Sequence, residues 1–342
     1  MFFYIVLFFC VILLVLIICF LFAYNNYQTF QKTEFGEMFS SLVFRPIDII
    51  NHNYYKTMDL GRAIKNIQIY GNQIVEGYKF MKNKKIVVCG LLYNAESQIK
   101  YLENWFNELK LLCKSCVFVI VENNSKDATR KLLIEWKKND PLQIHLVCLN
   151  TDYCDSDINK MSVNTSSPDP SRIRKMAFLR NCYVKYVQEN FTDFDYVFVK
   201  DLDLQGHLFW DGIFHSFFYL KTHSKLDVLT CNGIMRKGLR YYDTFAYAKD
   251  NFETSWNFGW DKRNHDHDVR EYVSAYYQKN MDLDKVASAF GGFAIYKMDQ
   301  FMDKFYSFDR NRLTCEHSLY HMLYENVHVN PRMIFLIEAN KT

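Results

Sequence analysis

Asp201 and Asp203 are the residues of this 342-residue chain whose type and spacing most clearly suggest chemistry. They follow the apolar run at residues 196–199, after Lys200. Two carboxylates at positions i and i+2 at the end of a buried strand can reach the same crevice. Carboxylate oxygens suit Mg²⁺ or Mn²⁺, and such an ion can clamp a diphosphate. An ordinary acidic turn is the alternative, because Asp-x-Asp strings also arise by chance. The position after a predicted strand favours a metal site.

A second polar segment, residues 122–127, follows another predicted strand at 116–121. A carboxylate such as Glu122 can accept hydrogen bonds there from ribose hydroxyls or from a base N–H. Alternatively, Ser125 or Asp127 caps a helix that begins at Thr129. Both interpretations stay open, because Glu122 and Asp127 can play separate parts.

Basic residues lie along the predicted helix 173–188. Arg172 and Arg174 are near its start, and Arg180 lies further along. Any of them could meet the phosphates of a bound nucleotide, and surface salt bridges are the alternative.

Two features of the C-terminal third could contact a substrate. The run that begins at Phe290 contains Gly291 and Gly292, whose missing Cβ atoms would let the backbone approach a sugar closely; a β-bulge is the alternative. Glu316 precedes a predicted helix at 318–324 and could take the proton of an acceptor hydroxyl or orient the acceptor. The alternative is a first-turn glutamate that the helix dipole favours.

Predicted strands and helices alternate through the segment that must hold these residues. Apolar runs typical of strands buried in a parallel sheet lie at residues 85–92, 116–121, 143–149 and 195–199. Helical spacing predicts helices near residues 60–80, 99–109, 129–138 and 173–188. Alternation with right-handed crossovers gives a doubly wound α/β layer, in which ligands bind beyond the carboxyl ends of the strands.

The N-terminal segment predicts a membrane anchor. Residues 2–23 carry no charge, and at about 1.5 Å per residue they span roughly 30 Å, enough to cross a bilayer. A cleaved signal peptide would need a basic start, a shorter apolar run and small residues at the cut site, and none of these is present. We therefore expect an anchor (residues 1–23), a polar stem (24–54) and one α/β domain (55–342).

Charge and cysteine content set few limits on location. A net charge of +3 is too small to make nucleic acid the main partner. Lys32 after the apolar segment is soon followed by Glu34 and Glu37, so charge alone leaves the orientation open. Cys113 and Cys116 have CxxC spacing without a second pair at zinc-finger distance, which favours two buried thiols. Sequons at Asn123, Asn164, Asn190 and Asn340 permit a lumenal location.

Six segments in a fixed order resemble GT-A glycosyltransferases, and more narrowly are similar to the fungal capsule-associated α-1,3-mannosyltransferase family. They are Glu122-Asn-Asn-Ser, Arg180-Asn181, Tyr196-Val-Phe-Val-Lys-Asp-Leu-Asp203, Tyr241-Tyr-Asp243-Thr-Phe-Ala, Ala289-Phe-Gly-Gly-Phe-Ala-Ile-Tyr-Lys297 and Cys315-Glu-His317. The resemblance covers most of residues 81–335. It implies a Rossmann-like GT-A domain in a type II membrane enzyme of the Golgi or endoplasmic reticulum lumen.

The resemblance also implies an activity and roles for individual residues. The enzyme would move a hexose such as mannose from a GDP- or UDP-sugar, with Mn²⁺ or Mg²⁺, to a glycan, glycolipid or glycoprotein acceptor. Asp201 and Asp203 would be the DxD pair, and Glu122 would hold the nucleoside. Gly291 and Gly292 would line the sugar site, and the acidic Glu316 would face the acceptor. This chain is shorter than the fungal proteins, so acceptor identity does not carry over.

A histidine could complete the divalent site, since neutral imidazole is a metal ligand. GT-A enzymes often place one after the last helix, where this sequence has His328, and this is the ligand we predict. His317, next to Glu316, is the alternative, although a lone histidine is more often a structural residue. The His-Asp-His-Asp run at residues 265–268 is better explained as a flexible loop near the acceptor.

Two other functional classes can be weighed against a transferase. A membrane-tethered, catalytically inactive protein that binds glycans or nucleotides could keep the same fold, although the intact Asp201/Asp203 pair disfavours it. A nucleotidyltransferase would need a glycine-rich, phosphate-cradling loop after the first strand. That position holds only Gly90, which argues against this class.

Overall fold

The computed structural model describes residues 63–148, 170–235, 240–249, 270, 273–274, 282–309 and 313–338. The predicted anchor and stem lie outside these residues and stay predictions. Among the described helices, none is both long and apolar enough to cross a bilayer. Residues 68–342 form one compact unit, and all the strands described below belong to it.

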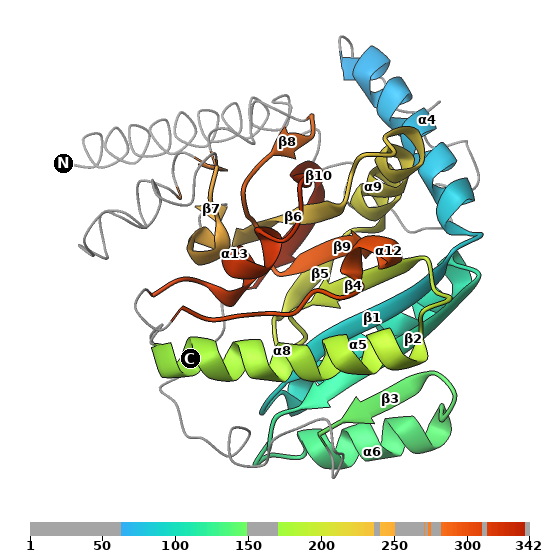
Figure 1. The fold of residues 1–342 in the computed structure, drawn as a ribbon. Coiled ribbons are helices and arrows are strands. Elements are labelled where there is room, and N and C mark those ends of the chain that lie inside the picture. Colours follow the sequence, from blue (N-terminus) through green and yellow to red (C-terminus); the bar gives the residue numbers. More distant parts are fainter. Residues whose placement is uncertain are drawn as a thin grey trace, which may run out of the picture. The chain divides into compact units, whose positions relative to one another are not determined.

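The core of this unit is a mixed sheet whose main strand order is β3-β2-β1-β4-β9-β6-β10-β5 (Figure 1). The strands are β1 Lys85–Leu92, β2 Ser115–Glu122, β3 Ile144–Val147, β4 Tyr196–Lys200, β5 Gly206–Leu208, β6 Val228–Met235, β9 Phe293–Lys297 and β10 Val327–Ile337. Two short strands, β7 Arg240–Tyr241 and β8 Asp284–Lys285, pair with β6 and β10.

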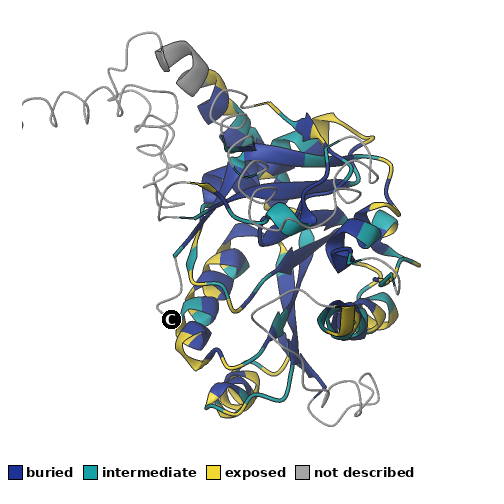
Figure 2. Cartoon of the chain, turned by 90° about the vertical axis from the view of Figure 1, so that its left-hand side faces the viewer, coloured by how far each residue is buried: buried dark blue, intermediate teal, exposed yellow. Residues whose placement is uncertain are grey.

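The first four strands confirm the predicted parallel layer. β1 pairs in parallel with β2 and β4, and β2 pairs in parallel with β3. Their sequences are rich in Val and Ile, and they are buried on both faces (Figure 2), as expected for parallel strands between two layers of helices. The sheet beyond β4 differs from the prediction. β9 runs antiparallel to both β4 and β6, so the whole sheet is mixed.

Helices cover both faces of the sheet because alternate strand residues point to opposite sides. Phe118 contacts the rings of Phe106 and Trp136, which come from α5 (Glu96–Leu112) and α6 (Thr129–Asn139). Its neighbour Val119 belongs to the core cluster on the other face, together with Leu179. The remaining helices are α4 Ala63–Met81, α8 Pro170–Asn190, α9 Trp210–Thr222, α12 Met298–Phe301 and α13 Glu316–His321.

The path of the chain creates a crossover point between β1 and β4. From β1 the chain moves outward through α5 and α6 to β2 and β3, and then returns along α8 to β4 on the other side of β1. Ligands of open α/β sheets bind outside the carboxyl ends of the strands at such a point. The fold therefore predicts that a ligand site lies among the residues that follow β1, β2 and β4.

Two buried histidines predict how the stability of this fold depends on pH. His321 contacts Ser288 Oγ through Nδ1 at 3.1 Å and the Tyr296 hydroxyl through Nε2 at 2.8 Å. Burial lowers the pKa of His321 to about 3, and burial together with Arg332 lowers the pKa of His215 to about 3. Both side chains therefore stay neutral in the folded state at pH values where the unfolded chain binds protons.

We expect the free energy of unfolding to fall as the pH drops from about 6.5 towards 3, by up to about 1.4 kcal/mol per pH unit for each histidine. Urea denaturation of the full-length chain between pH 7 and pH 4.5 measures this slope. His321→Gln should have a shallower slope than the wild type over the same range. Equal slopes for the two proteins would contradict the assignment of a buried, neutral His321.

Candidate functional site

Asp201 and Asp203 lie in the turn directly after β4, at the carboxyl end of the parallel strands. Leu202 between them is fully buried and anchors the turn, while the Asp201 amide donates to the Gly292 carbonyl at 3.0 Å. Asp203 is exposed, and 23% of the Asp201 side-chain surface is exposed to solvent. The predicted pair is thus held at the strand end rather than in the interior.

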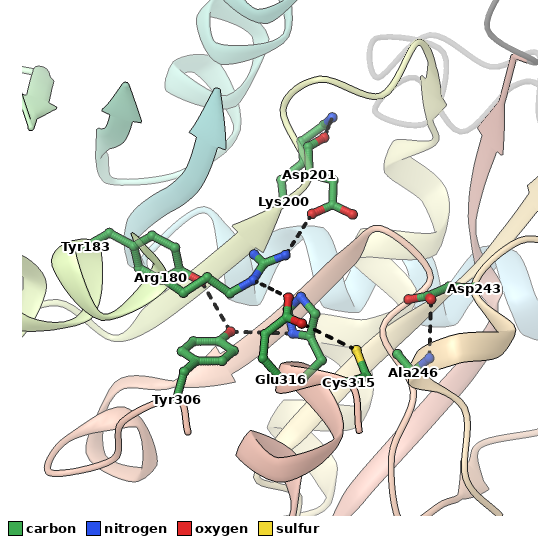
Figure 3. A network of polar contacts seen from close by, with 10 residues as sticks. Arg180, Tyr183, Lys200, Asp201, Asp243, Ala246, Tyr306, Cys315 and Glu316 are labelled. Carbon is green, nitrogen blue, oxygen red and sulfur yellow. Dashed lines mark hydrogen bonds and ion pairs between the residues drawn. The ribbon is translucent and has the colours of Figure 1, made fainter. Parts of the chain in front are cut away.

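Arg180, on α8, joins Asp201 to Glu316 (Figure 3). Its Nε donates to Glu316 Oε1 at 3.0 Å, and its Nη2 donates to Asp201 Oδ1 at 3.3 Å. The Arg180 side chain is only 4% exposed, and its guanidinium lies 5.6 Å from the ring centre of Phe290 and 5.7 Å from that of Tyr306. The alternative of a surface salt bridge is therefore wrong for Arg180, which is the buried centre of the cluster.

Glu316 is the first residue of α13, which begins two residues earlier than predicted. Its side chain is 7% exposed and points at Arg180. The Cys315 thiol lies 3.8 Å from the other carboxylate oxygen. A residue 136 positions away from Arg180 in sequence is thus fixed in place by a buried ion pair.

Asp243 is a further carboxylate of the site, and the pattern of the sequence predicts no role for it. It precedes the short helix η2 (Thr244–Ala246), and its Oδ1 accepts the Ala246 amide at 3.3 Å (Figure 3). The backbone of Gly291 also hydrogen-bonds to it. Burial raises the pKa of Asp243 to about 6; the bond from Ala246 opposes this rise, and the charge of Glu316 adds to it. The resemblance motif around Asp243 was the only signal, because neither β6 nor β7 was predicted.

The cluster has an excess of negative charge. Burial raises the pKa of Asp201 to about 7; Arg180 opposes that rise, and the charges of Asp203 and Asp243 add to it. The preceding residue, Lys200, is fully buried, and its Nζ donates to the Asp201 carbonyl at 3.0 Å. Burial lowers the pKa of Lys200 to about 8. A raised carboxylate pKa beside a partner cation indicates that further positive charge would stabilise this site.

These residues fit a divalent ion that shares its coordination with a ligand. Among the described residues, no three His, Cys, Asp or Glu side chains converge in the manner of an all-protein metal cage. Magnesium-type sites commonly use one or two carboxylates and complete the shell with water and substrate phosphates. Asp201 and Asp203 can supply such a pair, and their oxygens are hard ligands.

The structure does not bring His328 to this cluster. His328 lies in β10, opposite Leu229 of β6, which pairs with Ile295 of β9, which in turn pairs with Phe198 of β4. His328 is therefore three strands from β4 and level with a residue three positions before Asp201. Strand spacing and rise place the two backbones more than about 15 Å apart. The prediction of His328 as a metal ligand is corrected on this ground.

The other histidines considered do not replace it. His317 is buried, its ring stacks on Phe290 with 3.7 Å between ring centres, and its Nδ1 lies 3.5 Å from the Tyr306 hydroxyl. It therefore packs in the aromatic surroundings of Arg180. The run at residues 265–268 lies outside the described residues.

Glu122 and Asp127 have separate roles. Glu122 ends β2 and is fully buried; its Oε1 accepts the Ser125 amide at 2.5 Å, while its Oε2 has no partner among the described residues. Asp127 accepts the amide of Glu96 through Oδ2 at 3.2 Å and the amide of Thr129 through Oδ1 at 3.0 Å. Asp127 thus links the first turns of α5 and α6, and Glu122 keeps a free acceptor.

Gly291 and Gly292 form a turn that only glycine adopts without strain. Their φ angles are +66° and +93°, and a Cβ on Gly291 would lie 2.4 Å from the Cys231 carbonyl oxygen. This turn accepts the Asp201 amide and hydrogen-bonds to Asp243. In the described residues, the two glycines therefore serve to position Asp201 and Asp243. Contact between the glycines and a sugar stays a prediction.

The CxxC pair consists of two buried free thiols, Cys113 and Cys116, as expected.

Comparisons with known proteins give only distant likenesses. No family model matches the chain. No curated protein matches it either. Among solved structures, S. aureus TarS 1–349 is similar at a TM-score of 0.41 and 15% identity, over 75% of this chain and 60% of that one. A TarS complex with UDP-GlcNAc gives a TM-score of 0.39 and 15% identity, over 75% and 59%.

The mannosyltransferase PcManGT from Pyrobaculum calidifontis, in complex with GDP-Man and Mn²⁺, gives a TM-score of 0.41 and 12% identity, over 80% of this chain and 67% of that one. The chain spans about 60% of the TarS structures that it matches. All these values lie below 25% identity and a TM-score of 0.5, so these likenesses assign no function to the chain.

Proposed function

We propose that this chain is a metal-dependent glycosyltransferase that moves a hexose from a nucleoside-diphosphate sugar to a glycan, glycolipid or glycoprotein acceptor. The observation that carries the proposal is the gathering of Asp201, Asp203, Asp243 and Glu316 around buried Arg180, at the carboxyl end of β4. Four carboxylates from three separate segments, with raised pKa values for Asp201, Asp203 and Asp243, form a site that a divalent cation would stabilise.

The distance between the two ends of the proposed donor site suits a nucleotide. Glu122 pairs with Leu92 at the end of β1, and β4 lies on the other side of β1. Two strand spacings put Glu122 roughly 10 Å from the Asp201 turn. A nucleoside whose ribose or base donates to the free Glu122 oxygen would therefore present its diphosphate to Asp201 and Asp203.

In this proposal each acidic residue has a distinct task. A bound Mn²⁺ or Mg²⁺ would neutralise the charge that develops on the departing nucleoside diphosphate. Asp201 and Asp203 hold that ion, and Glu122 fixes the nucleoside. Glu316 and Asp243 face the acceptor side of the same cluster, where a carboxylate accepts a hydrogen bond from the acceptor hydroxyl. If transfer inverts the sugar carbon, one of them takes the hydroxyl proton; if it retains configuration, they orient the acceptor.

The donor and the location are further parts of the proposal. A GDP- or UDP-sugar is the expected donor, with mannose the favoured sugar through the family resemblance. The uncharged segment at residues 2–23 supports a single-pass anchor, and the sequons suit a domain in the Golgi or endoplasmic reticulum lumen.

Asp203→Ala should abolish donor hydrolysis and sugar transfer while changing the free energy of unfolding by less than about 1 kcal/mol, because an exposed ligand side chain contributes little to folding. The measurement is the activity of the full-length wild type and of the variant with GDP-mannose and with UDP-sugars. Each protein is assayed with Mn²⁺ and again after treatment with EDTA. EDTA should remove activity and Mn²⁺ should restore it.

Full activity in Asp203→Ala, or activity that EDTA does not affect, would refute metal-assisted transfer. Binding of a nucleotide sugar without hydrolysis or transfer to any acceptor would favour the alternative of an inactive, membrane-tethered binding protein.

Glu122→Gln and Asp127→Asn form a matched pair that tests the nucleoside site. A thermal-shift panel of UDP, GDP and their sugars with Mn²⁺ should identify the base, since at equal concentration a ligand that binds more tightly stabilises the fold more. Glu122→Gln should weaken binding of that nucleotide by about tenfold, the effect of one charged hydrogen bond.

Asp127→Asn should lower the melting temperature of the free protein and leave the nucleotide-induced shift close to that of the wild type, since Asp127 only links helix starts. The opposite pattern, with binding lost in Asp127→Asn alone, would reject the assignment of Glu122.

A further inference from the structure

We infer that Arg180 is a positioning residue that makes metal binding at Asp201 depend on the nucleotide, by occupying an oxygen of Asp201 until a diphosphate arrives. The inference rests on the proposed function. It concerns a property of Arg180 that neither the resemblance nor the proposed reaction assigns.

The guanidinium is shared between the two halves of the site. Nε pairs with Glu316 at 3.0 Å, and Nη2 pairs with Asp201 at the longer distance of 3.3 Å. Among the ion pairs of the described residues, these two carboxylates pair with Arg180 alone. The closer contact fixes Arg180 to Glu316, and the longer contact to Asp201 is the one that can be exchanged.

The surroundings of Arg180 prevent it from moving away into solvent. Its side chain is 4% exposed, with the guanidinium beside the rings of Phe290 and Tyr306. Tyr183, one turn along α8, also interacts with it. A buried charge that cannot reach water must keep its anionic partners or find new ones.

A divalent cation and Arg180 therefore compete for the same carboxylate. The Asp201 oxygen that accepts Nη2 is one of the four carboxylate oxygens that the Asp201/Asp203 pair can offer to a metal. A cation that binds there repels the guanidinium and removes one of its anionic contacts. Metal alone is thus expected to bind weakly.

The diphosphate offers Arg180 a replacement acceptor. The Nη1 atom of Arg180 is buried without a partner among the described residues, so this side chain already has an unused donor. When a metal binds the Asp201 oxygen that accepts from Nη2, Nη2 loses its partner and becomes a second free donor beside Nη1. The anionic oxygens of a nucleoside diphosphate can accept from both, as guanidinium–phosphate pairs commonly do. Metal and diphosphate then bind with positive coupling, and the coupling is reciprocal.

The test is a titration of the full-length protein with Mn²⁺, followed by the electron paramagnetic resonance signal of the free ion, without nucleotide and with saturating GDP or UDP. Arg180→Met alone would leave Glu316 buried and unpaired, so the informative variant is Arg180→Met/Glu316→Gln, which removes both charges. Glu316→Gln is the matched control, because it frees Arg180 to pair more closely with Asp201.

Without nucleotide, Arg180→Met/Glu316→Gln should bind Mn²⁺ at least about tenfold more tightly than Glu316→Gln, since these two proteins differ by one nearby positive charge. The double variant should also bind Mn²⁺ more tightly than the wild type, because no guanidinium occupies the Asp201 oxygen. Glu316→Gln should bind it more weakly than the wild type. The gain in Mn²⁺ affinity that GDP or UDP produces should be largest in the wild type and fall at least about tenfold in the double variant. A purely structural role for Arg180 would weaken metal binding in the double variant instead.

Equal Mn²⁺ affinities in the three proteins, or an undiminished nucleotide effect in the double variant, would overturn the inference while leaving the proposed function intact. Asp201→Asn/Asp203→Asn separates the two ideas. If that variant binds Mn²⁺ as the wild type does, or if the wild type binds none even with saturating GDP or UDP, the metal site itself is absent and both proposals fail.

Discussion

The buried ion pairs of Arg180 with Asp201 and Glu316 are the interaction on which the site depends. They connect the middle of α8 to the turn after β4 and to the start of α13, three segments that the sequence keeps apart. Burying a guanidinium in an aromatic setting costs free energy that only close carboxylates can offset. The same carboxylates are too many for one cation, and the excess charge makes the cluster a candidate for ligand binding rather than a structural salt bridge.

The fold supplies this arrangement through its crossover. Because the chain leaves β1 on one side and returns to β4 on the other, the ends of β2 and β4 lie on either side of the end of β1. Glu122 and the Asp201 turn are then separated by two strand spacings. The glycine turn before β9 also positions the acidic residues, since its backbone contacts both Asp201 and Asp243. Positions far apart in the sequence are thereby brought to within roughly 10 Å of each other.

Local sequence patterns predict the parallel strands and the acidic residues that follow them. The features that these patterns miss have physical reasons. β1, β2 and β4 are continuous Val- and Ile-rich runs, which are hard to mistake for anything but buried strands. β10 was missed because Pro331 interrupts it, and the structure accommodates the proline with a register shift between Asn330 and Ile334. His328, which was predicted as a metal ligand from its position after the last helix, lies within this strand. The role of Asp243 depends on long-range contacts, which spacing alone does not reveal.

A crystal of the full-length protein with Mn²⁺ and its preferred nucleoside diphosphate tests the central claim most directly, through the anomalous scattering of manganese. The account predicts one strong anomalous peak within about 2.0–2.2 Å of an Asp201 or Asp203 carboxylate oxygen, with phosphate oxygens completing the shell. A fully occupied nucleotide with no manganese peak, or with its peak away from both aspartates, would contradict it.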